Sequence, residues 1–295
     1  MNAKAKKKAS KKAFKGFTTQ DKILYHLQTF GAIFVTLLML FPIWIIIKTA
    51  TTEGKVLLNT SPNILPTSFT LANFAEACRR VPLFLYIGNT CIVTAIVMTS
   101  KIFFGTLAAY GFARGKFPGR DIIFYIILGA MMIPHQCTFI PVYTMMAKLK
   151  LVNTLWGLAF PSLIAARFIY MLRQSFKSVD QSYVYAGRID GLGTMGSIWH
   201  IMVPMCKATL ITVALNTFVS EWNNYFWPKI IAQSDKARTV TTGLVQLRES
   251  FGGTETWMNY NITMSGAIIT LIPAVAMFFL FQKYMIKGYA KTAMK

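Results

Sequence analysis

Long stretches without charged side chains dominate this chain of 295 residues and constrain its fold most strongly. Each stretch approaches or exceeds the ~20 apolar residues that a helix needs to cross a bilayer. A membrane β-barrel is excluded because the sequence has no series of ten-residue alternating segments. We therefore predict an all-α membrane protein with six transmembrane helices. The six runs are residues 27–47, 81–113, 122–147, 151–172, 208–228 and 256–282, and Lys101, Arg167 and Glu221 interrupt the second, fourth and fifth.

Lysine and arginine residues predict the orientation of the chain. Eight lysines lie within the first 22 residues, where Asp21 is the sole acid. Because cytoplasmic segments are enriched in basic residues, we expect residues 1–25 to form a basic cytoplasmic tail and residues 26–295 the membrane domain. Six spans then place both termini in the cytoplasm, in a multi-pass membrane protein.

The formal net charge of +21 also bears on partners. The basic residues are dispersed between the apolar runs, which suits attraction to anionic membrane lipid. Nucleic-acid binding is the weaker interpretation, because the sequence lacks a basic soluble face interleaved with aromatic residues. The three histidines and four cysteines are too scattered to predict a metal site or a disulfide framework.

The loop between the fourth and fifth runs does not resemble a solvated connection. From Ser182 to Ala208, apolar residues recur at three- and four-residue spacings, which predicts short helices with one apolar face. The Asp190-Gly191 pair and Gly193 interrupt this pattern, as an elbow between two helices would. An apolar helical face that leaves the membrane requires a soluble partner to cover it.

This loop resembles the EAA loop of ABC importer permeases. That family's pattern contains Glu-Ala-Ala, then Asp-Gly-Ala, then a helix and a proline. Here Tyr185 replaces the glutamate, Gly187 replaces the second alanine, and Leu192 replaces the alanine after the elbow. The resemblance implies that about residues 175–207 form the cytoplasmic loop that couples the permease to an ATPase. The candidate residues for this coupling are Tyr185, Ala186, Gly187, Asp190, Gly191, Ile198, Trp199 and Pro204.

Further local patterns are similar to carbohydrate-uptake permeases related to the smaller membrane subunit of the maltose transporter. They recur in order along nearly the whole chain after the lysine tail and include Leu107–Arg114, Met131–Pro134 and Trp222–Pro228. The resemblance implies a type I ABC importer bundle with its core in residues 81–283. It also implies a permease of a bacterial-type plasma (inner) membrane that passes a sugar or oligosaccharide delivered by an extracytoplasmic binding protein.

The resemblance implies a division of labour among subunits. This chain and a paralogous permease would form the path for the solute, while two separate ATPase subunits would use ATP and Mg. The predicted elbow would act as a rigid lever seated in one ATPase subunit. The chain itself has no GxxxxGK[ST] loop and no clustered catalytic set, so we expect neither enzymatic activity nor a bound cofactor.

Individual positions in the loop carry specific expectations. We expect Asp190 to cap the helix that follows the elbow, and Gly191 to adopt a turn conformation that a side chain would strain. Two alternatives stay open for Ile198 and Trp199. They could plug an apolar cleft of the ATPase, or they could pack against the spans of this chain.

The fifth run suggests contacts to the solute. Glu221 lies inside this run without a cation within one helical turn, beside Asn223 and Asn224. Amides, a carboxylate and aromatic rings suit the hydroxyls and ring faces of sugars, so these three residues are candidates for the solute path. We expect Lys101 to reach a membrane interface, and Trp227 to belong to an aromatic belt at the outer interface.

The alternative function is that of an ion-coupled secondary transporter of a small polar solute. Such proteins usually carry membrane carboxylates and inverted repeats. Glu221 is the sole acid well inside a run, and no repeat is evident.

Overall fold

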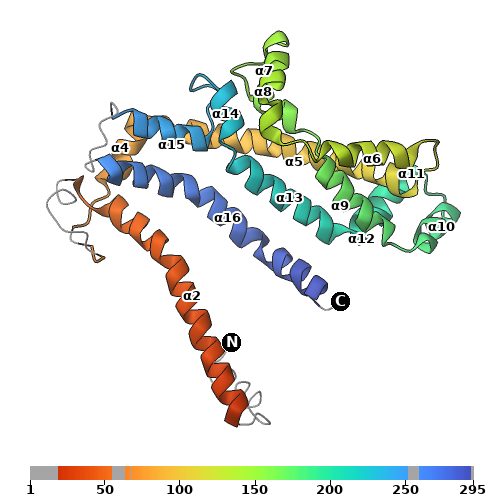
Figure 1. Ribbon diagram of the computed structural model, residues 1–295, viewed down its shortest axis with the longest axis horizontal. Coiled ribbons are helices and arrows are strands. Elements are labelled where there is room, and N and C mark those ends of the chain that lie inside the picture. Colours follow the sequence, from red (N-terminus) through yellow and green to blue (C-terminus); the bar gives the residue numbers. More distant parts are fainter. Residues whose placement is uncertain (1–18, 55–63, 67, 252–258, 294–295) are drawn as a thin grey trace.

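The computed structural model describes residues 19–54, 64–66, 68–251 and 259–293, and these residues form helices without any strand. Most of the predicted basic tail lies outside the described residues. The elements form an elongated bundle (Figure 1). They are α2 (Thr19–Thr51), α4 (Ala72–Arg80), α5 (Leu83–Arg114), α6 (Arg120–Ala130), η1 (His135–Thr138), α7 (Phe139–Lys148), α8 (Leu155–Ala159), η2 (Phe160–Ser162), α9 (Ala166–Lys177), α10 (Gln181–Ile189), α11 (Thr194–Gly196), η3 (Ser197–Met202), α12 (Val203–Met205), α13 (Lys207–Trp222), α14 (Phe226–Ile231), α15 (Val240–Glu249) and α16 (Tyr260–Ala293).

Three of the predicted runs are continuous helices long and apolar enough to cross a membrane. They are Ile23–Thr51, Leu83–Arg114 and Tyr260–Gln282. Two pairs of helices satisfy the same criteria together but are bent: Leu155–Ser162 with Ala166–Lys177 by 47°, and Thr194–Met205 with Lys207–Trp222 by 82°. The first pair covers most of the fourth predicted run, and α13 of the second pair covers most of the fifth. By length and composition alone, the described part of the chain therefore has three membrane-spanning helices, or five if each bent pair is one span.

The third predicted run is the one that departs from expectation. Helix α6 ends at Ala130, and α7 begins at Phe139 after turns and a short 3-10 segment. Pro134 lies in this break with a φ of −59°. Proline cannot donate a backbone hydrogen bond, and it disfavours a helical residue immediately before it. The predicted span over residues 122–147 is therefore divided into α6 and α7 and is not one continuous helix.

Helix α5 is the central element, and α9 and α13 pack along it. Small residues such as Gly105 and Ala109 allow close approach, and a Cβ at Gly105 would lie 3.5 Å from Leu172 of α9. One apolar cluster joins these helices to the elbow region. Its buried members are Ala109, Tyr110, Phe168, Leu172, Phe176, Val179, Val184, Ile198, Met202, Cys206, Leu210 and Val213.

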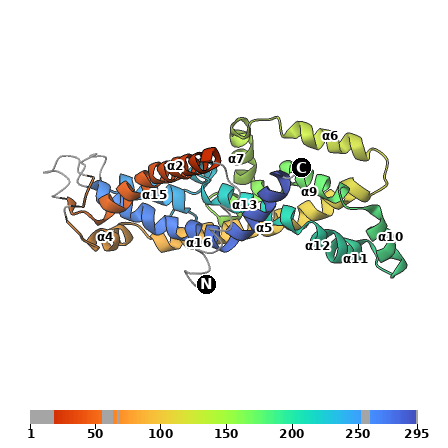
Figure 2. The same ribbon diagram turned by 90° about the horizontal axis from the view of Figure 1, so that it is seen from below.

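At the opposite end of the bundle, α4, α15 and the start of α16 close over the start of α5 (Figure 2). A buried amide network connects them to the end of α2. Asn73 donates to the carbonyls of Ala50 and Thr52 at 2.7 and 2.9 Å, and Asn261 donates to the Asn73 side chain at 2.9 Å. This network fixes the end of α2 that meets the bundle.

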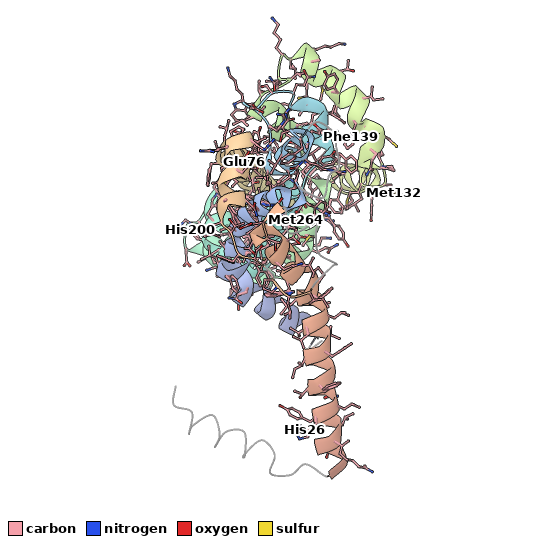
Figure 3. The ribbon with its side chains drawn as sticks, turned by 90° about the vertical axis from the view of Figure 1, so that its left-hand side faces the viewer. His26, Glu76, Met132, Phe139, His200 and Met264 are labelled. Atoms are coloured by element: carbon pink, nitrogen blue, oxygen red, sulfur yellow. The ribbon has the colours of Figure 1, made fainter. Side chains whose placement is uncertain are left out.

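The remainder of α2 stands away from the bundle. Its residues from Ile23 to Phe41 are largely exposed and apolar. Figure 3 shows His26 near the far end of this helix, well apart from Met264 of α16. An apolar helix surface of this kind suits hydrocarbon or another membrane helix and does not suit water.

Candidate coupling elbow and solute path

The elbow, residues 181–205, follows the connection between α9 and α10. The C-terminal end of α5 contacts this connection and fixes it. Arg114 donates to the carbonyl of Phe176 at 2.8 Å and also bonds the Val179 carbonyl and the Gln181 side chain. Asp180 then caps α10 by accepting the backbone N–H of Ser182 at 2.8 Å. This hydrogen bond lowers the pKa of Asp180 below its ordinary value. The entry into α10 is thus fixed by backbone and side-chain contacts.

The Asp190-Gly191 pair ends α10 as a sharp turn. Gly191 has a φ of +84°, which confirms the predicted turn conformation. A β-branched side chain is strongly disfavoured at such a φ. The predicted cap at Asp190 is wrong, however. Asp190 is the C-cap of α10, and α11 has Gly193 as its N-cap without a side-chain cap.

Leu192 explains why this chain departs from the alanines of the family pattern. A Cβ at Gly187 would lie 3.2 Å from Leu192 and 2.5 Å from Ile201. A Cβ at Gly196 would lie 3.0 Å from the same leucine. The larger side chain after the elbow therefore occupies space that the two glycines leave open, which packs α10 against α11 and η3.

The structure resolves the two alternatives for Ile198. This residue is 2% exposed and belongs to the cluster between α5, α9 and α13, so it packs within its own chain. Trp199 is 37% exposed and stacks on Phe103 of α5, with ring centroids 5.9 Å apart. Burial of Ile198 rules out its use as an exposed plug for a partner.

Other apolar residues form the exposed surface of the elbow. Ile189 is 87% exposed at the tip, and Ala186 is also exposed. The tip projects from one end of the bundle (Figures 1 and 2). We give the name elbow surface to four large exposed side chains of the elbow, Tyr183, Tyr185, Ile189 and Met195.

Pro204 lies where the elbow turns into α13. It is exposed within α12, directly after the π-helical segment η3. A π segment and a proline both perturb the regular hydrogen bonds of a helix. The chain then bends by 82° and continues as α13. The elbow and α13 are thus one continuous unit, with a bend and no flexible loop between them.

Glu221 is paired with a cation, contrary to the expectation that it lacks one. Lys101 of α5 donates to its carboxylate at 3.0 Å, and each side chain is 6% exposed. Lys101 also lies 5.5 Å from the ring centroid of Phe168. The prediction that the Lys101 side chain extends to a membrane interface is therefore wrong. A charge inside a membrane protein is stabilised by an opposite charge, and Glu221 supplies it.

The residues after Glu221 divide between the surface and the interior. Asn223 is exposed and Asn224 is half-buried. Trp227 is 6% exposed, and its indole N–H donates to the carbonyl of Gly157 at 3.1 Å. Trp227 thus packs in the cluster of α7, α8 and α14, and its burial contradicts the predicted place in an aromatic belt at the outer interface.

Gly191→Val is expected to reduce transport per inserted molecule by about tenfold, because a strained backbone of ~1–3 kcal/mol at the elbow would displace its exposed tip. Transport normalised to the quantity of membrane-inserted protein measures this effect. Gly193→Ala is the matched control, since Gly193 has a φ of −72° that any residue adopts. Equal transport by the two variants would contradict a requirement for the turn at Gly191.

Comparison with known proteins identifies the family of this chain. Residues 101–291 match the family described as "Binding-protein-dependent transport system inner membrane component". The chain is 28% identical over 269 residues to the arabinooligosaccharides transport system permease protein AraQ of Halalkalibacterium halodurans, covering 90% of this chain and 95% of the relative. It is 27% identical over 258 residues to the sn-glycerol-3-phosphate transport system permease protein UgpE of Yersinia enterocolitica, covering 85% and 91%.

A crystal structure shares the fold. It is a chain of a bacterial ABC transporter involved in the import of the acidic polysaccharide alginate. The TM-score is 0.78 at 22% sequence identity, and the match covers 91% of this chain and 98% of that chain. The fold is thus that of an ABC importer permease. The chain belongs to the family of inner membrane components of binding-protein-dependent transport systems.

Proposed function

We propose that this chain is one permease subunit of an ATP-driven importer for a sugar or oligosaccharide. An extracytoplasmic binding protein delivers the solute, and a paralogous permease completes the path. Two separate ATPase subunits use ATP and Mg, and this chain binds no cofactor of its own. The observation that carries the proposal is the apolar elbow surface, which projects at one end of the bundle and requires a soluble partner.

The packing supports the elbow as a lever. Val184 of α10 and Ile198 of η3 share one buried cluster with Leu210 of α13. Closely packed interiors transmit displacement because they have few voids to absorb it. When ATP draws the ATPase subunits together, the elbow moves with them and carries α13 as a rigid body. The bundle then changes between its inward-open and outward-open states.

The orientation of the chain follows from this assembly. The elbow faces the cytoplasm, where ATP is available, and both termini lie on the same side. The opposite end, with α4 and α15, faces the binding protein. The basic residues near the elbow, such as Arg114, Lys177 and Lys207, agree with the enrichment of positive charge on the cytoplasmic side.

We assign the solute path to the outer half of α13 and its end. Asn223 is exposed there, and Asn224 follows it. Glu221 remains a candidate through its position beside them, although Lys101 holds its carboxylate. On this proposal the Lys101–Glu221 ion pair holds the buried side of α13 against α5, and the side-chain amides of Asn223 and Asn224 face the solute.

Co-purification from cells that produce all the subunits tests this function. A tag on this chain should recover an ATPase subunit and a second permease, and vesicles holding the complex should take up carbohydrate only with ATP and the binding protein. A chain that drives uptake alone, in response to a proton or sodium gradient, would contradict the proposal and establish an ion-coupled transporter.

A further inference from the structure

The exposed face of α13 differs in chemistry from the other exposed membrane helices. Its exposed residues between Lys207 and Trp222 include Thr212, Asn216 and Ser220, and Val219 is the sole large apolar one. Asn223 extends the polar series at the C-terminal end. We call these four polar residues the α13 stripe. By contrast, the exposed residues of α16 in the described side chains are Tyr260, Leu271, Ile272, Val275, Ala276, Phe278, Phe279 and Leu280.

The α13 stripe lies on one side of the helix. At 3.6 residues per turn, its four members fall within about 80° of one another, and Glu221 falls about 180° from Thr212. The stripe extends about 16 Å along the axis at 1.5 Å per residue. The buried side of α13 holds the ion pair with Lys101 and the core residues, so the stripe is the side that this chain leaves uncovered.

Hydrogen bonds within the helix orient the polar groups of the stripe. Asn216 donates from Nδ2 to the carbonyl of Thr212 at 2.9 Å, and Asn223 donates from Nδ2 to the carbonyl of Val219 at 2.9 Å. Thr212 donates its hydroxyl proton to the carbonyl of Ala208 at 3.0 Å. These bonds engage one N–H of each amide and the Thr212 hydroxyl proton, and they leave the second amide N–H and the side-chain oxygens available to a solute hydroxyl.

We infer that the α13 stripe lines the water-filled path and accepts hydrogen bonds from the hydroxyls of an uncharged, polyhydroxylated solute. The remaining hydrogen-bonding capacity of these amides and hydroxyls would be unsatisfied against hydrocarbon, which is costly, so lipid does not cover this face. An anionic solute, such as a sugar phosphate, is usually bound by cationic side chains, and the four residues of the stripe carry no charge. This inference rests on the proposed function and narrows the class of its solute to neutral oligosaccharides.

Cysteine labelling of the assembled complex tests the location of the stripe. Single cysteines at Asn216 and Ser220 are introduced into a variant in which Cys78, Cys91, Cys137 and Cys206 are replaced. A small water-soluble methanethiosulfonate reagent should label both at least about tenfold faster than Phe278→Cys on α16, because thiolate chemistry requires water. Labelling no faster than at Phe278 in any nucleotide state would show that protein or lipid covers the stripe and would overturn the inference.

Uptake by the same complex tests the class of solute. Vesicles are offered arabino-oligosaccharides, malto-oligosaccharides and glycerol 3-phosphate. Asn216→Leu should reduce uptake of the neutral solute by about tenfold, because a solute hydroxyl is left unpaired in the path. Preferred uptake of glycerol 3-phosphate would overturn the inference and leave the proposed importer intact. Uptake of none of the three, with no ATPase in the complex, would instead contradict the proposed function.

Discussion

Glu221→Gln is expected to destabilise the folded bundle by about 3–5 kcal/mol, because it leaves the buried ammonium of Lys101 without its counter-charge. At the scale of a domain of this size, such a loss lowers the unfolding midpoint by roughly 10 °C. Loss of the monodisperse complex in detergent, followed as a function of temperature, measures the change. Lys101→Met is expected to show a similar loss, since it leaves the Glu221 carboxylate unpaired.

Two further variants separate pairing from packing. The double variant Lys101→Met with Glu221→Leu removes both charges and should recover most of the midpoint, since a buried pair can often be replaced by apolar residues of similar volume. Glu249→Gln removes an exposed carboxylate and should leave the midpoint unchanged. If Glu221→Gln behaved like Glu249→Gln, the ion pair would not stabilise the contact between α5 and α13.

Ile189→Asp is expected to weaken recovery of the ATPase subunit by at least about thirtyfold, which corresponds to the ~2 kcal/mol of a hot-spot residue in an interface. The side chain is 87% exposed at the tip of the elbow, so the change should leave the fold of this chain intact. Pull-down of the ATPase at increasing salt measures the effect.

Controls for this variant come from the same segment. Ile198→Asp places a carboxylate in the buried cluster, so it should reduce the quantity of folded protein before any association is measured. Ser178→Asp adds the same charge at an exposed position before α10 and should retain the ATPase. Normal recovery of the ATPase by Ile189→Asp would show that another surface of this chain carries the contact.

Much of the fold could be predicted from hydropathy, because the length of an apolar helix is set by the bilayer and not by contacts between distant residues. The runs at α2, α5 and α16 are single helices. Prediction was less successful where proline changes the backbone locally, as at Pro134 in the third run. The sequence shows that proline is present, but neighbouring helices decide whether a helix bends there or ends.

The direction of side chains in the elbow was harder to predict. Ile189 and Ile198 have the same chemistry, yet one is exposed and the other is buried. The π-helical segment η3 contains Ile198 and follows Ile189 in the chain. Such a segment shifts the helical repeat, so spacing alone does not identify the buried side. The turn at Gly191 was predictable because glycine itself favours a positive φ.

The ion pair was missed for a different reason. Lys101 and Glu221 are 120 positions apart, so a search for cations within one helical turn of Glu221 could not find the pair. A signal was nevertheless present in the sequence. Each residue is a charge well inside a predicted membrane run, and opposite charges at that depth are favoured as partners. Pairing charges between runs would have placed α5 beside α13.

ATP hydrolysis by the reconstituted complex tests the proposed coupling most directly. The wild-type complex in vesicles should hydrolyse ATP faster when the binding protein and its carbohydrate are added, and uptake should rise with it. Complexes that carry Gly191→Val should retain ATPase subunits but lose most of that stimulation, because the displaced elbow no longer moves α13. Full stimulation and uptake with a chain that lacks the elbow, residues 181–205, would contradict the transmission of ATP closure through this segment.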